Sequence, residues 1–234
     1  MDMAEPDRQM ARERYRFLPL VGGLFVAVLV VSNIIAVKPV AVGPLVLPAA
    51  IVLFPLAYII GDVLTEVYGF GQARRVIWIG FLANAVAVAA MLVGGVLPAA
   101  AFWGDQSAYD AILGATPRLL VASFLAYLVG ELLNSYVLAR LKVVTDGRHL
   151  WLRTISSTVF GQAADSVVFL SVAFAGVWSR DQLLLAIASQ FLVKVAYEAV
   201  LTPGTYLVTT ALKRSEGVDH YDHSTRFLPV PLPD

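Results

Sequence analysis

Six apolar stretches, each long enough to cross a lipid bilayer as a helix, dominate the sequence. A hydrocarbon core of about 30 Å needs roughly 20 apolar helical residues. The six stretches are Leu18–Val37, Pro48–Thr65, Ala73–Leu97, Arg118–Arg140, Thr154–Trp178 and Gln182–Leu212. We therefore expect an all-α integral membrane protein with six transmembrane helices in one domain, residues 18–212. A β-barrel would instead show short alternating strands.

Charged residues gather outside these stretches. They make up 15% of the 234 residues, and the mean hydropathy is +0.75, whereas soluble domains carry about 25% charged residues. Eight of them lie in Met1–Arg16 and seven from Lys213 onward. We expect residues 1–17 and 213–234 to be polar tails, the second extended or disordered. Thr202-Pro203-Gly204 should kink or interrupt the sixth helix.

Lysine and arginine positions predict the orientation. With the N-terminus inside, thirteen of them fall on the inner side and three on the outer side, and Lys194 lies within a helix. Cytoplasmic loops carry the excess of Lys and Arg. Both tails are therefore predicted to be cytoplasmic, in a multi-pass protein of the cell (inner) membrane. The longest outer connection, about residues 98–117, is expected to be partly ordered.

Several functions are disfavoured by what the sequence lacks. The net charge is zero, so no basic surface for nucleic acid is expected. There is no cysteine, P-loop, Gly-x-Ser-x-Gly or His-Glu-x-x-His, so we expect no enzyme, no cofactor and no metal site. His220 and His223 alone are too few for a metal. Asp62 and Asp165 could share a proton as in an intramembrane aspartyl protease, which is one alternative, although neither lies in a Gly-x-Gly-Asp context.

Polar side chains inside the apolar stretches are the candidate site. A charge at the centre of a membrane helix costs about 2.5–3.5 kcal/mol, so these groups should face inward. The candidates are Asn33, Asp62, Glu66, Asn84, Tyr127, Glu131, Asn134, Gln162, Asp165, Gln190, Lys194 and Glu198. Counting from the helix ends puts Glu131, Asp165 and Lys194 near mid-membrane, the depth at which secondary transporters hold their cargo.

Spacing places these residues on shared helix faces, and each face also has a structural interpretation. Residues four apart lie on one side of a helix, as do Gln190, Lys194 and Glu198. Lys194 and Glu198 could instead form an intrahelical ion pair. Asp62 and Glu66 could lie at the interface near Arg74 and Arg75, and Asn33 and Asn84 could join helices by hydrogen bonds.

A weak internal repeat links three helices. Leu56–Leu64 reads LAYIIGDVL and Leu125–Leu133 reads LAYLVGELL, 69 residues later. A fainter third copy places Glu198 at the acidic position and Lys194 at the tyrosine position. Hairpin repeats packed around an axis would direct three acids to one cavity. The alternative is a chance match, because membrane helices are built from few, mostly apolar, residue types.

Motifs along nearly the whole chain resemble the VUT family of queuosine precursor transporters. They are Ser32–Ala36 with Lys38, Phe54–Gly69, Ala73-Arg74-Arg75, Glu131 with Asn134-Ser135, Ser156-Ser157-Thr158, Gln162, Asp165-Ser166, Lys194, Glu198, Pro203, Tyr206 and Tyr221-Asp222. The resemblance implies a six-helix inner-membrane importer of 7-deazaguanine bases such as preQ0 and preQ1.

The implied cargo suits the candidate residues. A carboxylate such as Glu131 or Glu198 accepts adjacent N–H donors, and an amide such as Asn134 or Gln162 complements a carbonyl. Aromatic rings stack on bases, and the candidates are Tyr58, Phe124, Tyr127 and Tyr197.

The mechanism and the partners stay open. We expect a secondary or facilitative carrier in membrane lipid that flexes at Gly61 and Gly130. The alternative is a subunit that captures a vitamin-like molecule and needs a separate ATPase for transport. A structural scaffold is the third class. Ala83-x-x-x-Ala87 would allow a homodimer.

Overall fold

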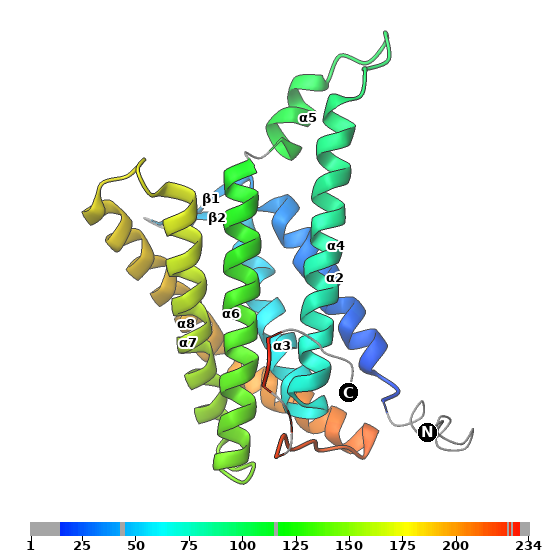
Figure 1. Ribbon diagram of the computed structural model, residues 1–234, viewed down its shortest axis with the longest axis vertical. Coiled ribbons are helices and arrows are strands. Elements are labelled where there is room, and N and C mark those ends of the chain that lie inside the picture. The colour runs from blue at the N-terminus through cyan, green and yellow to red at the C-terminus, as the bar shows by residue number, and fades with distance from the viewer. Residues whose placement is uncertain (1–14, 43–44, 115–116, 224, 226, 230–234) are drawn as a thin grey trace.

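The computed structural model describes residues 15–42, 45–114, 117–223, 225 and 227–229. Six long helices form a bundle (Figure 1): α2 (Leu18–Ile35), α3 (Phe54–Tyr68), α4 (Phe70–Val96), α6 (Pro117–Val144), α7 (Leu150–Phe174) and α8 (Arg180–Glu216). Among the described residues, six spans are long and apolar enough to cross a membrane. The six-helix membrane fold predicted from the sequence is confirmed.

Short elements occupy the connections at one end of the bundle. Strands β1 (Pro39–Val42) and β2 (Leu45–Pro48) pair antiparallel, and a 3-10 helix, η1 (Ala49–Val52), leads into α3. The long connection after α4 contains α5 (Gln106–Leu113), so it is ordered in part, as expected. The sequence analysis did not predict the strands, although alternating valines flank Gly43-Pro44.

The last helix is not interrupted at Thr202-Pro203-Gly204, so the expected break is wrong, whereas a kink at this position stays a prediction. Helix α8 runs without interruption past Pro203 to Glu216, four residues beyond the predicted end. A proline removes one backbone hydrogen bond of a helix. Next to it, the Thr202 hydroxyl donates to the Glu198 carbonyl at 3.0 Å, an interaction that supports the backbone at this turn.

Helix α3 lies at the centre of the bundle, where it contacts α2, α4, α6 and α8. In the apolar window of its span, 61% of the residues are buried, against 11% in the window of α8. Large apolar side chains on the outer helices, including Val86 and Val200, are exposed, as expected for surfaces that face lipid. Polar residues on α3 are therefore enclosed by protein.

The two ends of the helical domain meet on the same side. Glu216 at the end of α8 accepts hydrogen bonds from the backbone N–H groups of Arg16 at 2.9 Å and Phe17 at 2.7 Å, just before α2. This arrangement agrees with an even number of spans. Which side is cytoplasmic stays a prediction.

The chain after α8 folds back onto the bundle, which corrects the expectation of an extended or disordered tail. We call residues 217–223, 225 and 227–229 the C-terminal strap, drawn at the red end of Figure 1. Asp222 accepts from Phe70 N, Arg74 donates to the Leu228 carbonyl, and Trp78 donates to the Pro229 carbonyl at 2.8 Å. The strap therefore packs against the start of α4.

Candidate functional site

A cavity of about 310 Å³ opens among the helices towards the end of the bundle that carries β1 and β2, which we call the hairpin end. Four of the predicted site residues line it, namely Asn33, Asp165, Gln190 and Lys194. The other lining residues are Ser32, Ala36, Val37, Ala50, Ile51, Phe54, Ser123, Ala126 and Phe169. A mainly apolar pocket of this size with a few polar groups is typical of small-molecule sites.

A buried ion pair lies in the cavity wall. The Lys194 ammonium group of α8 pairs with the Asp165 carboxylate of α7, and the two side chains are 8% and 4% exposed. The same ammonium group lies 4.4 Å from the ring centroid of Phe54. Lys194 therefore pairs with Asp165, and no ion pair between Lys194 and Glu198 is found in the part of the chain that the structure describes. The alternative interpretation, an intrahelical pair, is therefore wrong.

Three further acids lie next to the cavity without lining it. Asp62, Glu131 and Glu198, which we call the carboxyl cluster, are at most 2% exposed. Asn134 Nδ2 donates to Asp62 Oδ1 at 2.6 Å, and the Thr158 hydroxyl donates to Glu198 Oε1. Both oxygens of Glu131 are buried without a hydrogen-bond partner among the described residues. These are the three acids that the predicted sequence repeat aligns, and the bundle brings them close together, whereas the repeat itself stays a prediction.

Close helix packing explains two glycines near the cluster. A Cβ atom on Gly61 would lie 1.8 Å from Glu131 Oε1, and one on Gly130 would lie 2.7 Å from the Tyr58 hydroxyl. Gly130 therefore admits no side chain at this separation, because Asp165 Cβ at 2.8 Å and the Gly161 carbonyl oxygen at 3.0 Å also lie there, whereas a side chain at Gly61 would require the Glu131 carboxylate to move. The observed reason for glycine is close approach; flexing at these positions stays a prediction.

Glu66 belongs to a separate ion-pair network at the strap end. Its Oε1 lies 2.7 Å from Arg153 Nη2, 2.7 Å from Lys213 Nζ and 3.6 Å from Lys142 Nζ. Lys142 and Arg153 are each 1% exposed. Sequence reasoning counted these cations as topology signals and missed their pairing with a buried acid.

The strap closes this network through Asp219, whose carboxylate lies 2.6 Å from Lys142 Nζ and 2.8 Å from Lys213 Nζ. Partial burial raises the pKa of Asp219, but hydrogen bonds from both lysines outweigh it and hold the pKa below its usual value.

The remaining predicted residues lie elsewhere in the core. Asn84 lines a separate cavity of about 40 Å³, shared with Asn33 and Met91. Tyr127 packs against Phe25 with ring centroids 6.3 Å apart. Tyr127 and Gln162 each bury an oxygen that has no partner among the described residues. Asn134, Asp62 and Glu198 lie at the carboxyl cluster. Their roles as substrate ligands stay predictions.

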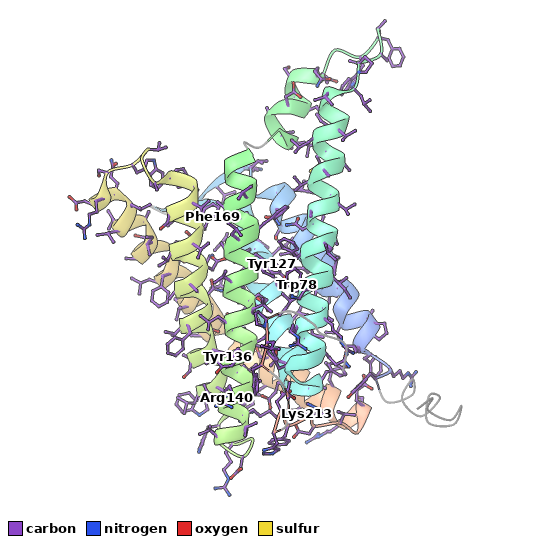
Figure 2. All side chains as sticks on the ribbon, in the orientation of Figure 1. Trp78, Tyr127, Tyr136, Arg140, Phe169 and Lys213 are labelled. Atoms are coloured by element: carbon purple, nitrogen blue, oxygen red, sulfur yellow. The ribbon has the colours of Figure 1, made fainter. Side chains whose placement is uncertain are left out.

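The polar groups form three levels along the bundle axis. Figure 2 shows Phe169, which lines the cavity, towards the hairpin end, Tyr127 at mid-height and Lys213 at the opposite end. Glu131 lies at the middle of α6. The cavity, the carboxyl cluster and the Glu66 network therefore follow one another from one end of the bundle to the other.

Of the nine cavity-lining residues that the sequence did not predict, three could have been found from helical spacing. Phe54, Ser123 and Phe169 line the cavity. Each lies four residues from a residue already discussed, namely Tyr58, Tyr127 and Asp165. Extending each helical face by one turn towards the hairpin end would have found them.

The geometry does not resemble a protease dyad. Asp165 pairs with Lys194, whereas Asp62 is hydrogen-bonded to Asn134. Within the described ranges, no three His, Cys, Asp or Glu side chains are arranged to hold a metal ion. The fold and the buried polar levels define a multi-pass membrane protein with a cavity among its helices.

Comparison with known proteins identifies the family. Residues 48–208 match the family described as putative vitamin uptake transporter, and the chain belongs to that family. It is 31% identical over 200 residues to the probable queuosine precursor transporter of Bacillus subtilis (strain 168), covering 83% of this chain and 86% of the relative. It is 27% identical over 165 residues to the queuosine precursor transporter of Escherichia coli (strain K12), covering 69% and 71%. No solved structure matches the chain.

Proposed function

We propose that this protein imports queuosine precursors, 7-deazaguanine bases such as preQ0 and preQ1, as a secondary or facilitative carrier. The names of two relatives that align over most of their length support the cargo class. The observation that carries the proposal is the cavity of about 310 Å³, which combines an aromatic wall with a buried ion pair. A planar base of this class would fit such a space.

The cavity wall offers complementary groups for a 7-deazaguanine. Phe54 and Phe169 would stack on the flat ring, an interaction worth about 1–3 kcal/mol per base. The Asp165 carboxylate would accept adjacent N–H donors of the pairing edge. The amides of Asn33 and Gln190 would complement the carbonyl and the remaining donors.

Lys194 would hold Asp165 in place until the base arrives. An unpaired carboxylate is costly in this setting, and the ammonium group offsets that cost in the unloaded cavity. The carboxyl cluster lies in the same polar core, and its acids would suit the aminomethyl cation of preQ1. We expect preQ0 and preQ1 both to enter, because the stacking surface is common to them.

Base uptake in cells that cannot make queuosine precursors tests the proposal. We expect this protein to restore uptake of labelled preQ0, and excess unlabelled preQ1 to reduce the signal, whereas excess biotin leaves it unchanged. Asp165→Asn should lower the initial rate about tenfold or more, since a hydrogen bond to a charged group contributes about 1.5–3 kcal/mol. Asp110→Asn, an exposed acid on α5, is the matched control. Normal uptake by Asp165→Asn at normal protein levels would remove that residue from the site.

Liposomes containing only the purified chain separate a carrier from a capture subunit. The family description refers to vitamin uptake, which keeps a capture subunit for a vitamin-like molecule as the second candidate. Entry of labelled base without any added protein supports the carrier. Binding without entry supports a capture subunit that needs a separate ATPase.

A further inference from the structure

The carboxyl cluster contains more acid than its surroundings can neutralise. Asp165 has Lys194, and Glu66 has Arg153, Lys142 and Lys213. Asp62, Glu131 and Glu198 have no cation within ion-pair distance in the described part of the chain. An ionised carboxylate buried without a partner is among the most costly groups in a protein interior. The cluster therefore requires added positive charge.

The contacts of Asp62 and Glu198 indicate what supplies that charge. Their side chains lie close enough to interact electrostatically, and each has one buried oxygen without a hydrogen-bond partner among the described residues. An ionised carboxylate only accepts hydrogen bonds, so two carboxyl groups bond to each other only when one carries a proton. Asn134 and Thr158 already donate to one oxygen of each residue, Asp62 Oδ1 and Glu198 Oε1. The other two oxygens, Asp62 Oδ2 and Glu198 Oε2, are buried without a partner among the described residues.

Glu131 connects this pair to the cavity. Its carboxyl group is 0% exposed, and it interacts electrostatically with Glu198 of α8 and Asp165 of α7. The Tyr58 hydroxyl of α3 is also buried without a partner, and it interacts with both Glu131 and Asp165. The titratable groups that interact with Glu131 are Tyr58, Asp62, Tyr127, Asp165 and Glu198, and Asp165 in turn pairs with Lys194. Glu131 and Tyr58 thus lie between the cavity wall, at Asp165, and the rest of the cluster.

We propose that the carboxyl cluster is a proton-binding site and that this protein couples the import of a base to the movement of a proton. This inference rests on the proposed function, and it names proton movement as the driving force for import of the base. One proton enters from the cavity side onto the cluster when a base occupies the cavity, and it leaves towards the strap end as the base does. The base itself is unchanged, and each cycle returns the cluster to its starting protonation.

Liposomes with a pH-sensitive dye inside test the coupling directly. The probe is preQ0, which lacks the aminomethyl group of preQ1 and so brings no amine proton of its own. We expect the interior to acidify when preQ0 is added outside, and not in liposomes without protein. With an acidic exterior, coupling of one proton per base accumulates labelled preQ0 about tenfold per pH unit.

The outcomes separate this inference from the proposed function. Entry of preQ0 with no acidification and no response to the pH gradient overturns proton coupling and leaves the transport proposal intact. Accumulation driven by a sodium gradient instead also overturns it. No entry of any labelled base contradicts the proposed function itself.

Substitutions locate the proton. Glu131→Gln keeps the shape of the side chain and cannot titrate, so the acidification and the tenfold accumulation should both be lost. Asp110→Asn, the exposed acid on α5, should retain both. Proton movement that persists in Glu131→Gln, Asp62→Asn and Glu198→Gln would overturn the assignment to the cluster.

Infrared difference spectra of the wild-type protein cover the case in which these variants fail to fold. Addition of preQ0 should change the band of protonated carboxyl groups. An unchanged band overturns the assignment to the cluster.

Discussion

Lys194 lies four residues before Glu198 on the same helix, yet its ammonium group pairs with Asp165 of a neighbouring helix. The pair joins α7 to α8 at the cavity wall. Glu198 instead accepts from Thr158. At the scale of single residues, Lys194 and Glu198 are thus each matched to a side chain of another helix, so a substitution at either position affects two elements at once.

Lys194→Met should destabilise the protein more than the double variant Asp165→Asn with Lys194→Met. The single variant leaves Asp165 buried and unpaired, which costs about 3–5 kcal/mol, whereas the double variant removes both charges. Thermal unfolding of purified protein in detergent measures the difference. Leu192→Ala, a 63% exposed position on α8, is the control and should have little effect. A double variant as unstable as the single one would contradict the pairing.

At the scale of elements, glycines set how closely α6 and α7 approach. A Cβ atom on Gly161 would lie 2.7 Å from Asn134 Cβ and 2.9 Å from the Gly130 carbonyl oxygen. Asn134 also holds Asp62 by a hydrogen bond. The separation of these two helices therefore positions the carboxyl cluster.

Gly161→Ala should lower stability and base uptake together. The added methyl group must push α6 and α7 apart, a form of overpacking that costs about 1–3 kcal/mol. Gly23→Ala on α2, where nothing lies within 4 Å of the new Cβ atom, should be neutral or stabilising by up to about 1 kcal/mol. Unfolding and uptake are measured on both variants. Equal behaviour of the two would show that the close approach is unimportant.

Two helix starts receive hydrogen bonds from the C-terminal part of the chain. The residue before α4 is Gly69, which has no side chain to cap the helix, and Asp222 accepts from Phe70 N at 3.0 Å. Glu216 plays the same role before α2, where Phe17 offers no polar group. Acids at helix N-termini also interact favourably with the helix dipole.

Asp222→Ala should destabilise the protein by about 1–3 kcal/mol, because the buried Phe70 N–H loses its acceptor. Asp222→Asn retains an acceptor oxygen and should lose less. Thermal unfolding compares the two variants with the wild type. If the alanine and asparagine variants both unfold close to the temperature of the wild type, the cap contributes little to stability.

At the scale of the whole molecule, the strap ties the end of the chain to the ion-pair network of α3, α6, α7 and α8. Lys142 Nζ donates to the Glu66 carbonyl at 2.5 Å and to the His220 carbonyl at 2.6 Å. The Tyr221 ring centroid lies 4.7 Å from the same nitrogen. Four helices and the strap thus share one buried cluster of charges.

Stability should depend on pH through Asp219. Its pKa is held below the usual value, so its contribution is present above about pH 4 and is lost as the pH falls through the lowered pKa. Asp219→Asn should therefore unfold at a lower temperature than the wild type at pH 7, and the gap should narrow as the pH falls below about 4. The side chain is 44% exposed, so the gap should be at most about 1 kcal/mol and should shrink in high salt. A gap that is independent of pH would contradict this contribution.

The membrane fold follows from the sequence alone, because six apolar helices are the solution that satisfies backbone hydrogen bonds in lipid. The same holds for which polar residues face inward, since Asp62, Glu131 and Lys194 are too costly to expose to lipid. How these groups are paired, and which of them line the cavity, depends on the three-dimensional packing of the helices. Helical periodicity fixes the face on which a side chain lies, whereas the partner depends on the rotation and separation of neighbouring helices. Residues distant along the chain, such as Glu66 and Lys213, thereby become partners.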